Sequence, residues 1–211
     1  MAATRGTRLH SYVVARDYGF APNPFFGVCT LATCKPGIRS YAQLGDWVVG
    51  TGSRLRGREE HLVYAMRVTG TMTLEQYWAD PRFQAKKPNL RGSKKQAFGD
   101  NIYSKDPNTG EWLQINSHHS LADGRPNPTN IGADTATDRM LYSEDFIYWG
   151  GSGPPLPPRF LGCAPHGASL VAGRGHKSTF PRGLVRNFVD WVRTLEQRGY
   201  SGEPEDWSRS P

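Results

Sequence analysis

The sequence predicts a loop-rich α+β or β-barrel fold rather than a helical bundle. Its 211 residues include 24 glycines and 16 prolines, which places much of the chain in turns. Short β-branched runs separate these turns, and one long amphipathic pattern near the C-terminus is typical of a helix. The length suits one hydrophobic core. We therefore expect a single domain over residues 1–200 and a flexible tail over residues 201–211.

The first part of the chain predicts two strands and a short helix. Residues 10–15 alternate and are β-branched, which indicates a first strand, and residues 28–33 form a second strand candidate. The loop between them, residues 16–27, contains prolines and glycines and should be ordered. Residues 38–44 have room for about two helical turns, which Gly45 would end.

The next part predicts a hairpin followed by a short helix. Residues 46–53 run as a strand into a glycine turn, residues 54–60 form an exposed tip, and residues 61–69 return as a strand. Thr73 and Gln76 have the spacing of a capping box for a short helix that ends at Asp80.

The last part combines an irregular segment, two strands and a helix. Residues 98–138 are polar and poor in periodicity, so this segment is either functional or mobile. Residues 139–143 and 145–149 indicate two further strands, followed by a proline-rich connector. Residues 180–198 predict an amphipathic helix, because its apolar side chains share one face; these are Leu184, Val185, Phe188, Val189, Val192 and Leu195.

Charge, apolar content and cysteine content predict the partners of the protein and its location in the cell. The formal net charge of +7 favours polyanionic partners such as nucleotides or DNA. No run of apolar residues approaches the length of a membrane span, so we expect a cytoplasmic protein without a membrane partner. The three cysteines, Cys29, Cys34 and Cys163, lack the paired spacing of a secreted disulfide framework and are expected to be reduced.

The loop after the first strand predicts a nucleotide pocket. It carries a cation, an acid, an amide and aromatic rings, which together suit stacking on a base and pairing with its polar edge. The residues are Arg16, Asp17, Tyr18, Asn23 and Phe25. The alternative is a turn in which Asp17 and Asn23 satisfy backbone donors.

Two further segments could contact phosphate. The first segment consists of Gly50, Thr51, Gly52 and Ser53. Its two glycines could let backbone N–H groups approach a phosphate, although a plain glycine hairpin explains the segment as well. The stretch 82–95 contains cations and no acid, and could track a nucleic-acid backbone or form a solvated loop. Its cations are Arg82, Lys86, Lys87, Arg91, Lys94 and Lys95.

The candidates for a chemical step are Asp17, Cys34 and His118. Cys34 precedes Lys35, and a nearby cation lowers the pKa of a thiol, although a structural cysteine is the simpler interpretation. His118 and His119 could act as general acid or base, with a carboxylate to orient them; the candidates are Asp134, Asp138 and Asp145. We expect no metal and no cofactor, because the cysteines and histidines lack the tight pairs of a zinc site.

The string YVVARDYGFAPNPFFGVCTLATCKPGIRSYAQLGDWVVGTGS, together with DRMLYSEDFIYWGG, resembles the second of the numbered nucleotide-modification-associated domain families. That family is associated with prokaryotic and phage gene systems that handle hypermodified DNA bases. Residues 45–80 are similar, more loosely, to the barrels of the PUA, ASCH and EVE group. This second resemblance implies a PUA-like or EVE-like barrel with a modified-base site near Asp17, Asn23, Thr30, Gly50, Thr51, Ser53 and Tyr64.

Three functions follow as expectations. The first is recognition of a nucleotide or modified base in a DNA modification or anti-phage context. The second is an enzyme that alters a base or nucleotide, and the third is an interaction subunit that binds protein partners from the same gene system. Whether the chain is an enzyme stays open at this point.

Overall fold

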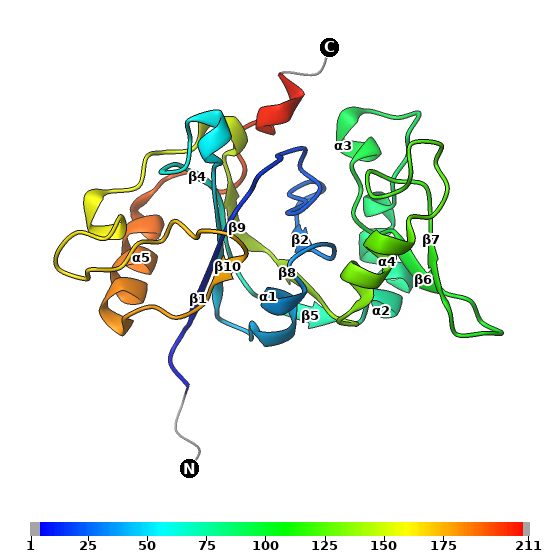
Figure 1. Ribbon diagram of the computed structural model, residues 1–211, viewed down its shortest axis with the longest axis horizontal. Helices are drawn as coiled ribbons and strands as arrows, with labels where there is room; N and C mark the ends of the chain where they lie inside the picture. The colour runs from blue at the N-terminus through cyan, green and yellow to red at the C-terminus, as the bar shows by residue number, and fades with distance from the viewer. Residues whose placement is uncertain (1–4, 209–211) are drawn as a thin grey trace.

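A six-stranded sheet forms the centre of the computed structural model, which describes residues 5–208 (Figure 1). The strand order is β10-β1-β3-β4-β9-β11. The β1–β3 and β9–β11 pairs are parallel, and the other neighbours are antiparallel. The strands are β1 (Leu9–Val13), β3 (Trp47–Thr51), β4 (Leu62–Arg67), β9 (Asp145–Tyr148), β10 (His176–Lys177) and β11 (Gly199–Tyr200).

Helix α5 (Arg182–Thr194) covers one face of this sheet. Its buried residues Leu184, Phe188 and Val192 pack against strand residues such as Trp47 and Ile147. Their spacing puts them on one helical face, so the amphipathic pattern in the sequence correctly predicts this helix.

A second layer covers the other face. It contains a three-stranded sheet of order β2-β8-β5, with β2 (Cys29–Leu31), β8 (Met140–Ser143) and β5 (Gly70–Met72), and the helix α1 (Pro36–Tyr41). Leu31 and Ile38 from this layer pack with Val48, Val63 and other residues of the central sheet. The loop between β2 and α1 is therefore anchored at both ends by buried, well-packed residues.

An outer lobe lies beyond this second layer (Figure 1). Its elements are α2 (Leu74–Ala79), α3 (Lys94–Ala97), β6 (Tyr103–Lys105), β7 (Trp112–Gln114) and α4 (Pro128–Thr135). Thr73 and Gln76 form the capping box that the sequence predicts for α2. Short 3₁₀ helices occupy Arg54–Arg56, Pro81–Lys86, Gly150–Ser152, Pro158–Phe160 and Glu205–Trp207. Much of the segment 98–138, irregular in sequence, thus belongs to this lobe.

The mixed fold with mostly antiparallel sheets is confirmed, whereas the barrel is not. Within residues 5–208 the central sheet ends at the short strands β10 and β11 and stays open. The chain returns to this sheet between β8 and β9, where the Ser143 hydroxyl oxygen lies 2.6 Å from the carbonyl oxygen of Arg67 and 2.8 Å from that of Asp145. This bend separates β8, in the second sheet, from β9, in the central sheet, so the two strands do not continue as one.

The C-terminal residues up to Ser208 lie against the domain. Strand β11 pairs with β9, and the Trp207 indole donates to the Tyr18 carbonyl oxygen at 3.0 Å. The predicted tail began at residue 201, and its last residues, 209–211, lie outside the described residues. Over residues 5–208, the structure contains no helix that combines the length and the apolar character of a membrane span.

We predict that Gly50→Ala destabilises the fold by about 1–3 kcal/mol, because overpacking forces neighbours to move. A Cβ at Gly50 would lie 2.5 Å from the Tyr64 ring and 2.6 Å from a Val14 methyl group. Gly132→Ala, in α4, meets open space and should be neutral or slightly stabilising. Urea unfolding measures both variants, and equal stability of the two would contradict the packing argument.

Candidate functional site

Cys34 lies in a strained turn between β2 and α1. Both Cys34 and Lys35 adopt left-handed backbone conformations, with φ of 58° and 43°. Such conformations cost of order 1–3 kcal/mol for residues other than glycine and cluster at functional sites. The Cys34 backbone N–H donates to Asp134 Oδ1 at 2.6 Å. The turn is therefore held from outside by a carboxylate of the outer lobe.

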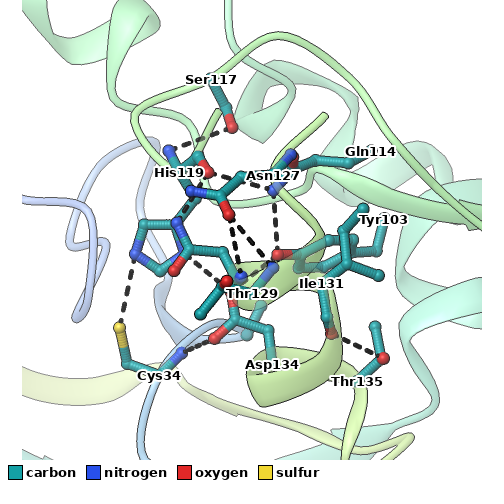
Figure 2. A network of polar contacts seen from close by, with 12 residues as sticks. Cys34, Tyr103, Gln114, Ser117, His119, Asn127, Thr129, Ile131, Asp134 and Thr135 are labelled. Atoms are coloured by element: carbon teal, nitrogen blue, oxygen red, sulfur yellow. Dashed lines mark hydrogen bonds and ion pairs between the residues drawn. The ribbon is translucent and has the colours of Figure 1, made fainter. Parts of the chain in front are cut away.

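His119 bridges the Cys34 sulfur and the Asp134 carboxylate (Figure 2). Its Nε2 lies 3.6 Å from Cys34 Sγ, and its Nδ1 lies 2.7 Å from Asp134 Oδ2. The His119 carbonyl oxygen accepts from Asn130 Nδ2 at 2.7 Å, which fixes the loop that carries the ring. A thiol, an imidazole and a carboxylate in this order are the arrangement of an activated cysteine nucleophile.

Asp134 is buried, and both of its carboxylate oxygens accept hydrogen bonds within this site. It lies on α4, whose first turn is capped by the Asn127 side chain. Besides the contacts with His119 and Cys34, its Oδ2 accepts from the Tyr103 hydroxyl at 2.8 Å. A carboxylate fixed by three donors orients the imidazole it contacts.

Arg39, on α1, joins the same two parts of the chain. Its side chain is fully buried, and its guanidinium donates to the carbonyl oxygens of Cys34 at 2.9 Å, Ala32 at 2.6 Å and Arg139 at 3.0 Å. It also donates to the Asp134 carbonyl oxygen. A buried cation is costly unless its donors are satisfied, and these carbonyl groups satisfy them. Burial nevertheless lowers the pKa of Arg39.

The two neighbouring histidines have opposite proton affinities. Burial alone would lower the pKa of His119, but the Asp134 carboxylate and Cys34 outweigh it and raise the pKa to about 9. For His118, desolvation and the charges of His119 and Arg16 all lower the pKa. His119 is therefore protonated at neutral pH and His118 is neutral.

Aromatic rings continue from the histidines towards the surface. Phe20 lies 4.6 Å from the His119 ring and 5.2 Å from the His118 ring, measured between centroids. Tyr18 lies 4.8 Å from His118 and stacks on Phe98 at 5.1 Å. Tyr18 and Phe98 are half-buried and His118 is exposed, so part of this aromatic cluster is open to a planar ligand.

Cys34, His119 and Asp134 are also a possible metal-ligand set, because their ligand atoms lie within 4.8 Å of one another. The geometry fits a metal less well than a triad. Asp134 bonds to Nδ1 of His119, whereas Cys34 faces Nε2. A metal between sulfur and Nε2 would have Asp134 as the hydrogen-bond partner of its histidine, not as a direct ligand.

Asp17, a candidate from sequence, lies elsewhere. It is buried, its Oδ1 accepts from the Tyr148 hydroxyl at 2.5 Å, and its backbone N–H donates to Asp206 at 2.7 Å. Burial raises the pKa of Asp17 to about 6, although the bond from Tyr148 opposes the shift. These contacts tie β9 and the C-terminal segment to the first loop.

Asn23 and Thr30, two further predicted binding residues, belong to a buried network. The Lys86 ammonium donates to Asn23 Oδ1 at 2.7 Å, and the Thr30 hydroxyl donates to Asp100 at 2.8 Å. Tyr77 donates to the other Asp100 oxygen at 2.7 Å. Lys86, predicted to contact a nucleic-acid backbone, is thus buried, and burial lowers its pKa to about 8.

The other predicted binding residues are spread over the fold. Gly50 and Thr51 lie within β3, Gly52 follows it, and Ser53 caps the 3₁₀ helix Arg54–Arg56. Tyr64 is buried and donates to the Tyr12 hydroxyl. Phe25 is buried and stacks on Trp207, whereas Arg16 is exposed.

Most cations of the segment 82–95 reach the surface. Arg82 pairs with Asp80 at 2.7 Å, and Arg91 is exposed. The ammonium groups of Lys87 and Lys95 lie over the rings of Trp78 and Tyr200, and Lys94 donates to the Trp207 carbonyl oxygen.

Sequence reasoning thus named Cys34, and it named His119 and Asp134 among several options, but it could not choose the pairing. It missed Arg39 and Tyr103. Arg39 carries no signal, because an arginine in a short helix is usually exposed. Only the position of the irregular segment across the second layer brings these residues together.

We predict that Arg39→Met destabilises the protein by about 3 kcal/mol or more, because it leaves several buried carbonyl groups unsatisfied. Arg91→Met, at an exposed position, is the matched control and should change stability little. Thermal and urea unfolding compare them. A variant at position 39 as stable as the control would remove the structural role assigned to this cation.

Titration of the imidazoles by NMR should give a pKa near 9 for His119 and one below 6.5 for His118. Asp134→Asn should return the pKa of His119 towards 6.5. Because the folded state holds this proton more tightly, the stabilisation from His119 is complete below about pH 6.5 and is lost as the pH rises through 9. Titration of His119 at or below 6.5 in the unmodified protein would contradict this assignment.

Comparison with known proteins gives one family. No curated protein and no solved structure matches the chain at a significant level. Residues 6–211 match a family described as nucleotide modification associated domain 2, which confirms the resemblance found in the sequence. The match covers nearly the whole chain and links it to nucleotide modification, so the chain belongs to the nucleotide modification associated domain 2 family.

Proposed function

We propose that this protein is a cysteine-dependent enzyme that attacks an electrophilic carbonyl carbon carried by a nucleotide or a modified base. The contact of Cys34 Sγ with His119 Nε2, backed by Asp134, carries the proposal. The strained backbone at the half-buried Cys34 supports it, because such strain clusters at active sites. The family's association with nucleotide modification supports the class of substrate.

The chemistry follows from the three side chains. His119 holds the thiol proton as an imidazolium, and the Cys34 thiolate forms a sulfur–carbon bond while the carbonyl π electrons move to oxygen. Collapse of this adduct breaks the bond to the leaving group, which takes the proton from His119. Water, deprotonated by His119, then attacks the thioester and restores the thiol. Asp134 keeps the imidazole oriented throughout.

The aromatic cluster of Tyr18, Phe20, Phe98 and His118 would hold the base. Its rings lead from the surface to His119, so a base stacked on Tyr18 or His118 would place a substituent near the sulfur. The neutral state of His118 leaves one ring nitrogen free to accept a hydrogen bond from an exocyclic amine. Arg16, beside it, would contact a phosphate.

The alternative is a binding protein without turnover, acting on a modified base in a DNA hypermodification or anti-phage system. The same aromatic cluster favours that function, and only the triad distinguishes the two. The remaining predicted binding residues, including Asp17 and Asn23, stay predictions for either case.

We predict that iodoacetamide modifies Cys34 at pH 6 more than tenfold faster than it modifies the exposed Cys163. A protonated imidazole beside a sulfur favours the reactive thiolate. His119→Gln should remove most of this difference, whereas Cys29, which is buried, should not react while the protein is folded. Peptide mass spectrometry measures each site separately in one sample, so Cys163 serves as an internal control.

Turnover is tested with a deoxycytidine that carries an acetyl group on its exocyclic amine. The unmodified protein should release deoxycytidine, and Cys34→Ser should retain binding of the probe without release. Tyr18→Ala should weaken binding of the probe. Ordinary reactivity of Cys34 combined with tight binding and no release would favour the binding protein; absence of both binding and release would leave the interaction subunit.

A further inference from the structure

An open groove of about 900 Å³ lies between the N-terminal segment and α5, and it shares no lining residue with the Cys34 site. Its walls come from residues 5–9, from the start of β3 and the end of β4, and from one face of α5. The lining includes one acidic residue, Asp190. It also includes six arginines, namely Arg5, Arg8, Arg67, Arg182, Arg186 and Arg193.

The arginines on α5 form a stripe. Arg182, Arg186 and Arg193 are separated by four and seven residues, which places them within about 40° of one another around the helix axis. The opposite face of α5 carries Leu184 and Phe188 into the core. Burial of that apolar face therefore fixes the direction in which the guanidinium groups point.

Most of these charges have no partner of their own. Arg5 pairs with Asp46, and Arg67 lies 4.0 Å from Asp145. Within residues 5–208, no ion pair engages Arg8 or the three arginines of α5, and all four are exposed. Like charges crowded along a groove repel one another, and an anionic ligand would relieve this repulsion.

We propose that this groove binds the phosphate backbone of duplex DNA. Planar guanidinium groups donate in pairs to phosphate oxygens. Arg182 and Arg193 are about 16 Å apart along the helix, whereas a DNA strand carries a phosphate every 3.4 Å or so of helix axis. The stripe therefore spans several phosphates and is larger than one mononucleotide needs.

The lining also favours a duplex over a single strand. Its aromatic residues are Trp47, which is buried in the core, and Phe180, which is half-buried. Binding of unpaired bases normally relies on exposed aromatic rings, and this groove offers guanidinium groups instead. The proposal goes beyond the cysteine chemistry proposed above and does not depend on it.

The test measures binding of a short fluorescent DNA duplex by anisotropy over a range of salt concentrations. Removing three charges with Arg182→Gln, Arg186→Gln and Arg193→Gln together should weaken binding at least tenfold. The slope of log affinity against log salt should fall by about 2–3, since each neutralised phosphate contributes about 0.9. A matched variant with Arg82→Gln, Arg91→Gln and Lys95→Gln should bind within about twofold of the unmodified protein.

Two further variants separate the possible outcomes. Asp190→Asn removes the one acid from the lining and should tighten binding, a gain that misfolding cannot produce. Cys34→Ser should bind DNA unchanged, so failure of the cysteine chemistry would leave this result intact. Unchanged affinity of the α5 variant, loss confined to the 82–95 variant, or tighter binding of an RNA duplex or polyglutamate than of DNA would overturn the proposal.

Discussion

The candidate site depends on one buried cation. Arg39 sits at the junction of α1, the β2–α1 turn and α4, and its guanidinium is shared among carbonyl groups of all these neighbours. A guanidinium has five N–H donors in a fixed plane, so it can hold several chain segments in one geometry. Because the buried donors must be satisfied, the segments cannot separate without a large cost. This constraint places α4, and with it Asp134, beside Cys34.

Asp134 sets the protonation of the two neighbouring histidines. One of its oxygens fixes the backbone of the Cys34 turn, and the other receives the His119 imidazole and the Tyr103 hydroxyl. The carboxylate favours the charged form of His119, and that charge in turn helps to keep His118 neutral. Two adjacent histidines thus acquire different chemistry from a single buried acid. One is suited to hold a proton beside the sulfur, and the other to accept a hydrogen bond at the surface.

The two proposed sites, the Cys34 site and the α5 groove, lie on opposite sides of the central sheet. The second layer and the outer lobe lie on one side of the sheet and α5 lies on the other (Figure 1). The first side carries the cysteine and the aromatic cluster, and the arginines of α5 line the groove on the second. The sheet is common to both, since its two faces are covered by separate hydrophobic clusters. A change in one site should therefore leave the other folded.

The sequence by itself determined the local elements and the class of the protein. Strand alternation, the capping box at Thr73 and the apolar face of α5 all act over a few residues, and the family match was legible in the first strands and turns. The arginines of α5 also have the spacing of one helical face, but only the tertiary structure showed that this face borders a groove. Only the tertiary structure decided that the sheet stays open, that Lys86 and Arg39 are buried, and that His119 pairs with Cys34. These outcomes depend on contacts between residues far apart in the chain, which local patterns do not encode.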